Sequence, residues 1–173
     1  MSQSEPEPQW IVPSQRKHLR LPDYDYATPG IYFVTVSTHR RACLFGSVVH
    51  GGVLLNDAGH TVESCWLEIP RHFDGIDLDK YVVMPNHVHG LLVLRHGGVN
   101  FGAVVAGFKS AATRRIREAI DMSGPPVWQR GYHEHVVRSQ KALARIRQYV
   151  VNNPIKWDLD DENPERTRRQ VPR

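Results

Sequence analysis

The stretch that most constrains the fold is residues 81–94, YVVMPNHVHGLLVL. Two apolar runs rich in Val and Leu flank the turn-like pair Pro85-Asn86, a pattern typical of two adjacent β-strands. His87 and His89 follow the turn, and side chains two residues apart on a strand point to the same face. Neutral imidazole is the commonest metal ligand in proteins. The pair is therefore either half of a metal site or two structural histidines bonded to local groups.

The other hydrophobic patterns predict an α+β fold around these two strands. We expect strands over 31–38, 76–84, 87–94 and 132–137, a small inserted hairpin over 45–55, and helices over 57–69, 101–122 and 140–152. Pro70 and Pro154 follow the first and last helices. Without the hairpin and the last helix, the order is βαββαβ, the ferredoxin-like split βαβ arrangement with a central antiparallel sheet. In this topology the strand that begins at His87 belongs to the central pair.

Length and composition fit a single domain with tails. The chain has 173 residues, of which 40% are hydrophobic and 23% are charged. We expect a disordered tail over 1–15, one domain over 16–157 and a charged tail over 158–173. No apolar run approaches the length of a membrane span, and the polar N-terminus does not resemble a signal peptide. Cys43 and Cys65 lack the spacing of a disulfide framework or a zinc ribbon, which fits a reducing cytoplasm.

Positive charge is concentrated in residues 101–150. This segment has nine Lys or Arg and three Asp or Glu, a charge of +6, whereas the rest of the chain sums to −2 within a net charge of +4. A localised positive surface favours a polyanionic partner through counterion release. A solvated helix face would explain the same charges, so the charge distribution alone leaves both interpretations open.

The last predicted helix adds a second group of candidate site residues. Tyr149 and Asn153 are four residues apart, which places both side chains on one face of a helix. Because Asn153 precedes Pro154, its backbone is biased away from helical dihedrals, so this geometry is not assured. A phenol is a potential covalent nucleophile, and an amide oxygen is a potential metal ligand. Together with the His pair and the basic segment, they indicate phosphoryl transfer on nucleic acid, although Tyr149 taken alone would better fit a core aromatic residue.

Several motifs resemble a single family and occur in that family's order. MPNHVHGLLV is similar to the HUH signature of single-tyrosine endonucleases of the transposase kind. YVVNNPIKW is similar to the tyrosine helix of their REP-associated branch, whose members occur beside repetitive extragenic palindromes. VWQRGYHEHVVR and PDYDYATPGIYFVTVSTHRRACLFG also resemble that branch. The similarity covers roughly residues 16–157 and is far more specific than a lone His-x-His pair.

The resemblance implies a metal-dependent endonuclease and strand-transferase that acts on single-stranded and hairpin DNA. It makes His87, His89 and Asn153 the ligands of Mg²⁺ or Mn²⁺. It makes Tyr149 the nucleophile, which would form a 5′-phosphotyrosine intermediate. The residues expected to contact DNA or to support the site are Arg16, Lys17, Arg20, Arg40, Arg41, Lys109, Arg114, Arg115, Arg117, Trp128, Gln129, His133, His135 and Arg138.

Three questions remain open from the sequence. A zinc hydrolase would combine the first His pair with His133 and His135, but no cysteine ligand and no helical HExxH supports it. A domesticated DNA-binding protein on the same fold would bind DNA without cleaving it. The oligomeric state is the third question, and we expect a monomer rather than the homodimer of insertion-sequence relatives. We further expect a bacterial cytoplasmic protein, associated with the nucleoid when bound to DNA, with no small-molecule cofactor.

Overall fold

The centre of the fold is a four-stranded antiparallel sheet. The computed structural model describes residues 25–120, 124–160, 162–164 and 166. The strands of the sheet are β1 (Gly30–Ser37), β4 (Ile76–Met84), β5 (His87–Leu94) and β6 (His133–Val137). They pair in the order β4-β5-β1-β6, which puts β5 and β1 in the middle. The α+β fold and the ferredoxin-like order of its strands are therefore confirmed.

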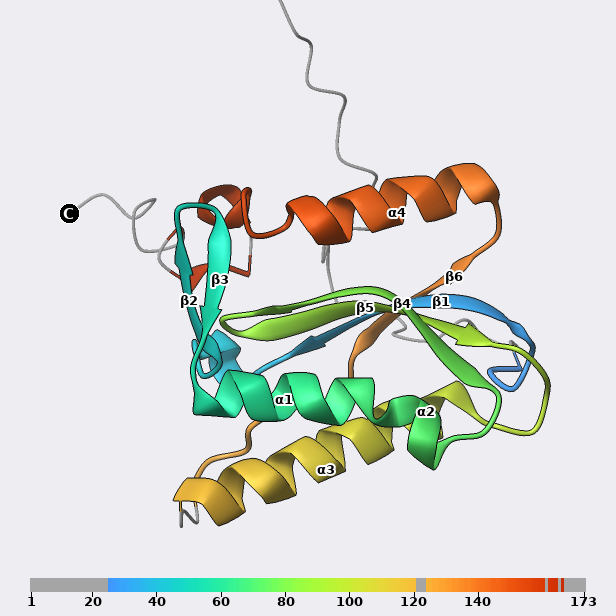
Figure 1. Ribbon diagram of the computed structural model, residues 1–173, viewed down its shortest axis with the longest axis horizontal. Coiled ribbons are helices and arrows are strands. Elements are labelled where there is room, and N and C mark those ends of the chain that lie inside the picture. Colours follow the sequence, from blue (N-terminus) through green and yellow to red (C-terminus); the bar gives the residue numbers. More distant parts are fainter. Residues whose placement is uncertain (1–24, 121–123, 161, 165, 167–173) are drawn as a thin grey trace, which may run out of the picture.

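Helices cover both faces of this sheet (Figure 1). The helices α1 (Asp57–Leu67), α2 (Ile69–His72) and α3 (Phe101–Ile120) lie on one face, and α4 (Gln140–Asn152) lies alone on the other. Trp66, Phe108 and Tyr32 belong to the large cluster of buried residues on the first face, here called the α1/α3 core. A much smaller cluster, the α4 core, holds α4 to the second face; its buried members are Phe33, Leu91, Leu143, Ile146 and Val150.

The alternation of side chains along β5 assigns its residues to these two cores. Val88 and Leu92 enter the α1/α3 core, whereas Leu91 enters the α4 core. His87 and His89 have the parity of Leu91 and face the same side as α4. Between these positions Gly90 is required, because a Cβ there would lie 2.1 Å from Cζ2 of Trp66. The strand thus combines a tightly packed apolar face with a polar one.

Local signals explain where the helices begin and end. The side chain of Asn56 caps α1 by accepting a hydrogen bond from the amide of Gly59. Ser139 caps α4 in the same way, through the amide of Ala142. The first helix ends at Leu67, earlier than predicted, and Pro70 lies in the first turn of the separate helix α2 rather than after α1. This placement is consistent with the missing amide hydrogen of proline, which a first helical turn does not need.

The predicted hairpin is present and forms a two-stranded sheet of its own. Its strands are β2 (Gly46–Val49) and β3 (Gly52–Leu55), and its turn has a left-handed backbone at His50 and Gly51. In Figure 1 the hairpin stands at the end of the molecule where α4 ends. A short helical turn, η1 (His39–Arg41), follows β1, and a second one, η2 (Trp157–Leu159), follows α4.

The first residues of the predicted charged tail pack against the domain. Beyond η2, the side chains of Glu162 and Asn163 are buried, with exposures of 7% and 4%. Composition predicts a solvated segment here, but the carbonyl of Glu162 accepts a hydrogen bond from Asn86 in the turn between β4 and β5, and Asn163 donates to the carbonyl of Trp157. Among the described residues, no helix is long and apolar enough to cross a membrane.

Candidate metal and tyrosine site

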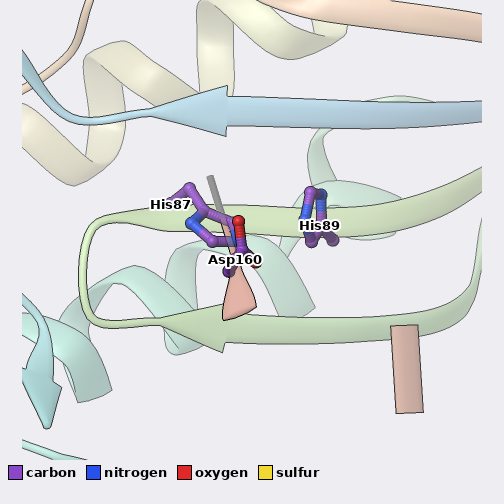
Figure 2. Close-up of side chains that lie close together, drawn as sticks. All are labelled: His87, His89 and Asp160. Carbon is purple, nitrogen blue, oxygen red and sulfur yellow. The ribbon is translucent and has the colours of Figure 1, made fainter. Parts of the chain in front are cut away.

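The two histidines of β5 lie side by side in the interior. His87 is 0% exposed and His89 is 3% exposed, and their ring centroids are 4.3 Å apart. Figure 2 shows Asp160 beside them, brought there by the segment that follows η2. One ligand atom from each of these three residues lies within 4.8 Å of the others. The predicted His pair is therefore part of a compact group of metal-ligating side chains.

His87 has one bonded ring nitrogen and one that lacks a partner. Its Nδ1 lies 2.9 Å from Oδ1 of Asn86, whereas its Nε2 is buried and has no hydrogen-bond partner among the described residues. Burial lowers the pKa of His87, and the carboxylates of Asp160 and Glu162, together with the neighbouring side chain of Asn153, partly oppose this shift. The ring is thus held in the neutral form, which is the form that coordinates metals.

His89 connects the sheet to the tyrosine helix. Its Nδ1 forms a 2.8 Å hydrogen bond with Oγ1 of Thr35 on β1. Its Nε2 forms a 3.2 Å hydrogen bond with the hydroxyl of Tyr149, although the two residues are 60 positions apart in the chain. Burial, reinforced by neighbouring His87, lowers the pKa of His89 well below its ordinary value. The phenol of Tyr149 therefore reaches the His pair of its own chain.

The position of Tyr149 follows from the way α4 docks. Leu143, Ile146 and Val150 form the buried stripe of the helix and pack on Phe33 and Leu91. Tyr149 lies beside this stripe and is partly buried. Its ring meets Phe33 edge-on at 6.1 Å between centroids and lies 5.2 Å from the His89 ring. The apolar packing of α4 and the neighbouring rings of Phe33 and His89 thus orient the phenol toward β5.

Asn153 completes the group from the end of α4. Despite preceding Pro154, Asn153 has helical dihedrals (φ −57°, ψ −43°), so it shares a helix face with Tyr149. Its side chain is 1% exposed, and its Nδ2 donates to Oδ2 of Asp160 at 3.2 Å. Its Oδ1 is buried and has no hydrogen-bond partner among the described residues. An unpaired amide oxygen and the unpaired Nε2 of His87 are thus both available as ligands.

Sequence reasoning missed four residues that shape this site: Asp160, Glu162, Asn86 and Thr35. The first two belong to an acidic run that composition placed in a solvated tail. Glu162 accepts a hydrogen bond from the hydroxyl of Ser37 at 3.5 Å and forms an ion pair with Arg41 at 3.2 Å. Asn86 was interpreted only as a turn residue. The available signal was its position next to His87, together with an acidic run shortly after a candidate tyrosine helix.

The four basic residues of α3 lie on the face of the sheet opposite the His pair, and each contacts another group of the protein. Nζ of Lys109 donates to the carbonyls of Gln129 and Gly131 at 2.9 Å, and burial lowers its pKa. Arg115 forms a two-bond ion pair with Glu68. The remaining two arginines have weaker contacts: Arg114 lies 3.9 Å from Glu118, and Arg117 donates to the carbonyl of Gly124. None of these four residues is brought near the His pair.

The other expected DNA contacts fall into different environments. Trp128 is 7% exposed and donates its ring N–H to the carbonyl of Lys109, so it is a core residue of the α1/α3 side. Gln129, His133 and Arg138 are exposed and His135 is partly exposed. Arg40 and Arg41, in the turn after β1, both have a left-handed backbone. Arg16, Lys17 and Arg20 lie outside the described residues.

The second His-x-His pair faces the same side of the sheet but does not join the first. His133 pairs with Thr35 and His135 with Phe33 across the ladder between β6 and β1, so β1 separates them from β5. Within the described ranges, the group that could hold a metal consists of His87, His89 and Asp160. This arrangement gives no support to a zinc site built from four histidines.

Comparison with known proteins identifies the family. Residues 32–153 match the family described as "Transposase IS200 like". This match covers most of the chain, including both histidines, the tyrosine and Asn153. The chain belongs to the IS200-like transposase family. Membership in this family makes it a DNA-processing enzyme, as the motifs predicted.

Individual relatives agree with this assignment. A Haemophilus influenzae protein of uncharacterized function is 32% identical over 166 residues, covering 84% of this chain and 91% of its own length. A second H. influenzae protein, provisionally named a REP-associated tyrosine transposase, is 25% identical over 142 residues, covering 76% of this chain and 74% of its own. A REP-associated tyrosine transposase, solved bound to a REP hairpin, shares the fold with a TM-score of 0.61 and 22% identity, over 80% of this chain and 73% of that one.

Proposed function

We propose that this IS200-like transposase is a metal-dependent endonuclease and strand-transferase of the REP-associated type. It acts on single-stranded DNA at hairpin sites and forms a covalent intermediate through Tyr149. The observation that carries the proposal is the 3.2 Å hydrogen bond between the Tyr149 hydroxyl and Nε2 of His89. It brings a potential nucleophile into contact with a potential metal ligand in a buried site. The resemblance to REP-associated transposases in sequence and fold supports the type of DNA.

In the proposed reaction the phenolic oxygen of Tyr149 attacks a phosphorus of the DNA backbone. A bond forms between this oxygen and phosphorus, the bond to the 3′-oxygen breaks, and the phenol proton is transferred so that a 3′-hydroxyl is released. The 5′-phosphate stays attached to Tyr149, and a reverse attack by another 3′-hydroxyl transfers the strand. The edge-on contact with Phe33 and the position beside the α4 core orient the phenol.

The residues of the site fit a divalent metal. Nε2 of His87 and Oδ1 of Asn153 are buried acceptors without a hydrogen-bond partner among the described residues, and a cation would satisfy both. The two histidines, Asn153 and the carboxylate of Asp160 form a mixed nitrogen and oxygen donor set, which suits Mg²⁺ or Mn²⁺. When bound, such a metal polarises the phosphate and stabilises the charge that develops during transfer. Coordination by Nε2 of His89 would replace its hydrogen bond with Tyr149.

DNA contacts are proposed on the face of the sheet that carries α4. His133 lies on this face, and partial burial together with the positive charge of Arg41 lowers its pKa. Arg40, Arg138 and Gln129 are exposed, and these side chains are proposed to contact the phosphate backbone. Because the tyrosine and both histidines come from one chain, a monomer with a complete site is the proposed active form. The proposed domain remains 16–157, with Asp160 and Glu162 as functional additions from the following segment.

The decisive experiment looks for the covalent intermediate. The protein is incubated with Mn²⁺ and a labelled hairpin oligonucleotide that has single-stranded flanks, and adducts that survive denaturation are resolved on a gel. We expect an adduct with the wild-type protein, none with Tyr149→Phe, and none without metal, while Tyr149→Phe binds the oligonucleotide with wild-type affinity. Cleavage by Tyr149→Phe would contradict the nucleophile. Binding without any wild-type adduct would instead indicate a non-cleaving DNA-binding protein.

A further inference from the structure

Asn86 is a fully buried polar residue in the turn between β4 and β5. Its exposure is 0%, and each polar atom of its side chain is engaged. Nδ2 donates to the carbonyl of Arg41 at 3.0 Å and to the carbonyl of Glu162 at 2.7 Å, and Oδ1 lies 2.9 Å from Nδ1 of His87. One amide therefore connects three separate parts of the chain: the turn after β1, the start of β5 and the segment after η2.

These contacts determine the orientation of the amide. Both partners on the Nδ2 side are backbone carbonyls, which only accept hydrogen bonds, so the NH₂ group has to face them. Oδ1 then faces His87 and is itself only an acceptor, so Nδ1 of His87 has to carry the proton that it donates. In a neutral imidazole this leaves the lone pair on Nε2. Asn86 thus dictates which nitrogen of His87 is available as a ligand.

That nitrogen is the one without a hydrogen bond of regular geometry in the described part of the chain. Nε2 of His87 and Oδ1 of Asn153 are both buried, and neither has a hydrogen bond of regular geometry among the described residues, although the Asn153 side chain lies beside the His87 ring. We propose that Asn86 is a positioning residue that holds His87 as the Nδ1–H tautomer, presents its Nε2 to a divalent cation, and ties this ligand to the segment that carries Asp160. The inference rests on the proposed function and assigns a role to a buried residue that acts through a ligand, His87, rather than as a ligand itself.

Among the described residues, the partner of Nδ1 in the second histidine, His89, does not fix its tautomer. Nδ1 of His89 is bonded to the hydroxyl of Thr35, which can donate or accept a hydrogen bond. Thr35 therefore restrains the ring of His89 without selecting its tautomer. Loss of the polar partner should consequently disturb coordination more at His87 than at His89. Partners of this kind orient metal ligands, and their removal typically weakens metal affinity about 10- to 100-fold.

Three variants separate positioning from stability. Asn86→Ala removes the acceptor for His87 and both donors, whereas Asn86→Asp keeps an acceptor and loses both donors. Asn56→Ala is the matched control, because the Asn56 side chain likewise accepts one hydrogen bond and donates another. It accepts from the amide of Gly59 and donates to the carbonyl of Leu44, at the start of α1 and away from the site. All three should lower the melting temperature. Only Asn86→Ala should weaken Mn²⁺ binding, by about 10- to 100-fold, with Asn86→Asp within about threefold of the wild type.

Two measurements are made on the full-length chain. Titration followed by the electron paramagnetic resonance signal of free Mn²⁺ gives the affinity. Long-range ¹H–¹⁵N correlation spectra of the metal-free protein give the His87 tautomer, which should be Nδ1–H in the wild type and mixed in Asn86→Ala. An Nε2–H tautomer in the wild type, or equal Mn²⁺ affinity in Asn86→Ala and Asn56→Ala, would overturn the role of Asn86. A wild-type protein that binds no Mn²⁺ contradicts the metal site of the proposed function, and with it this role.

Discussion

The two faces of the central sheet differ in what they contribute. The face toward α1 and α3 is covered by a large apolar core that includes the buried ring of Trp66. The face toward α4 has a small apolar core and, next to it, a group of buried polar side chains that includes His87, His89 and Asn153. Burying polar groups without partners costs free energy, which apolar burial elsewhere has to offset. The comparison indicates that one face stabilises the fold while the other holds the buried polar residues of the candidate site.

Charge is divided between the faces in a way that the sequence does not reveal. The basic residues of α3 form much of the +6 segment, but Lys109 and Arg115 are bonded to groups of the protein itself. On the site face, the exposed Arg138 lies close enough to His135 to lower its pKa, and Arg41 reaches the site through Glu162. A high local charge in the sequence is therefore weak evidence for the position of a nucleic-acid interface.

The largest expected effect concerns the packed face. Gly90→Ala would place a Cβ 2.1 Å from Cζ2 of Trp66, a ring that is 1% exposed and cannot move aside. We expect a loss of about 3 kcal/mol in the free energy of unfolding, the upper end of the usual range for overpacking. Chemical denaturation measures this loss. The control is Gly97→Ala, where the nearest atom to an added Cβ is a carbonyl 3.7 Å away, and a similar loss in that variant would contradict the argument.

An intermediate effect is expected on the site face, where α4 is fixed by a polar contact as well as by its small core. Arg147, two residues before Tyr149, forms a multiply bonded ion pair with Asp79 of β4, whose side chain is 15% exposed. The register of β4 against β5 is irregular between Leu78 and Tyr81, where Asp79 lies. We expect Arg147→Ala to slow formation of the tyrosine–DNA adduct roughly tenfold, because small displacements of a reacting group are costly.

Single-turnover measurements test this expectation. The exposed Arg145 of the same helix provides the control variant Arg145→Ala, which should keep the wild-type rate. The double variant Asp79→Arg with Arg147→Asp should recover most of the rate. Burial alone would raise the pKa of Asp79, but hydrogen bonds from Arg147 and the Lys80 amide lower it overall. The contribution of the pair to stability is therefore present at neutral pH and is lost as the pH falls through this lowered pKa. Unchanged rates in Arg147→Ala would show that the α4 core alone positions the tyrosine.

Much of this architecture can be predicted from local patterns. The limits of α4 follow from the cap at Ser139 and the stripe of Leu143, Ile146 and Val150, and they agree with the expected 140–152. The His pair and Tyr149 follow from motifs. Asp160 could not be predicted, because its position depends on the chain turning back after η2 onto the turn between β4 and β5. Sequence periodicity does not predict such a long-range contact, and the charged composition of the segment predicts a solvated tail instead.

The smallest expected effect is on the packed face and concerns DNA binding. Arg114 and Arg117 lie on α3, away from the site, so the double variant Arg114→Ala with Arg117→Ala should change the affinity for a hairpin oligonucleotide less than twofold if the site face is the interface. Arg138→Ala, beside His135 on the other face, and Arg40→Ala, in the turn after β1, should each weaken binding and reduce the slope of log affinity against log salt concentration by about one. Fluorescence titrations at several salt concentrations measure both quantities. If the slope of log affinity against log salt concentration instead fell by one unit per arginine in the α3 variant, the DNA would have to contact both faces. The two faces would then not be divided into one that stabilises the fold and one that binds DNA.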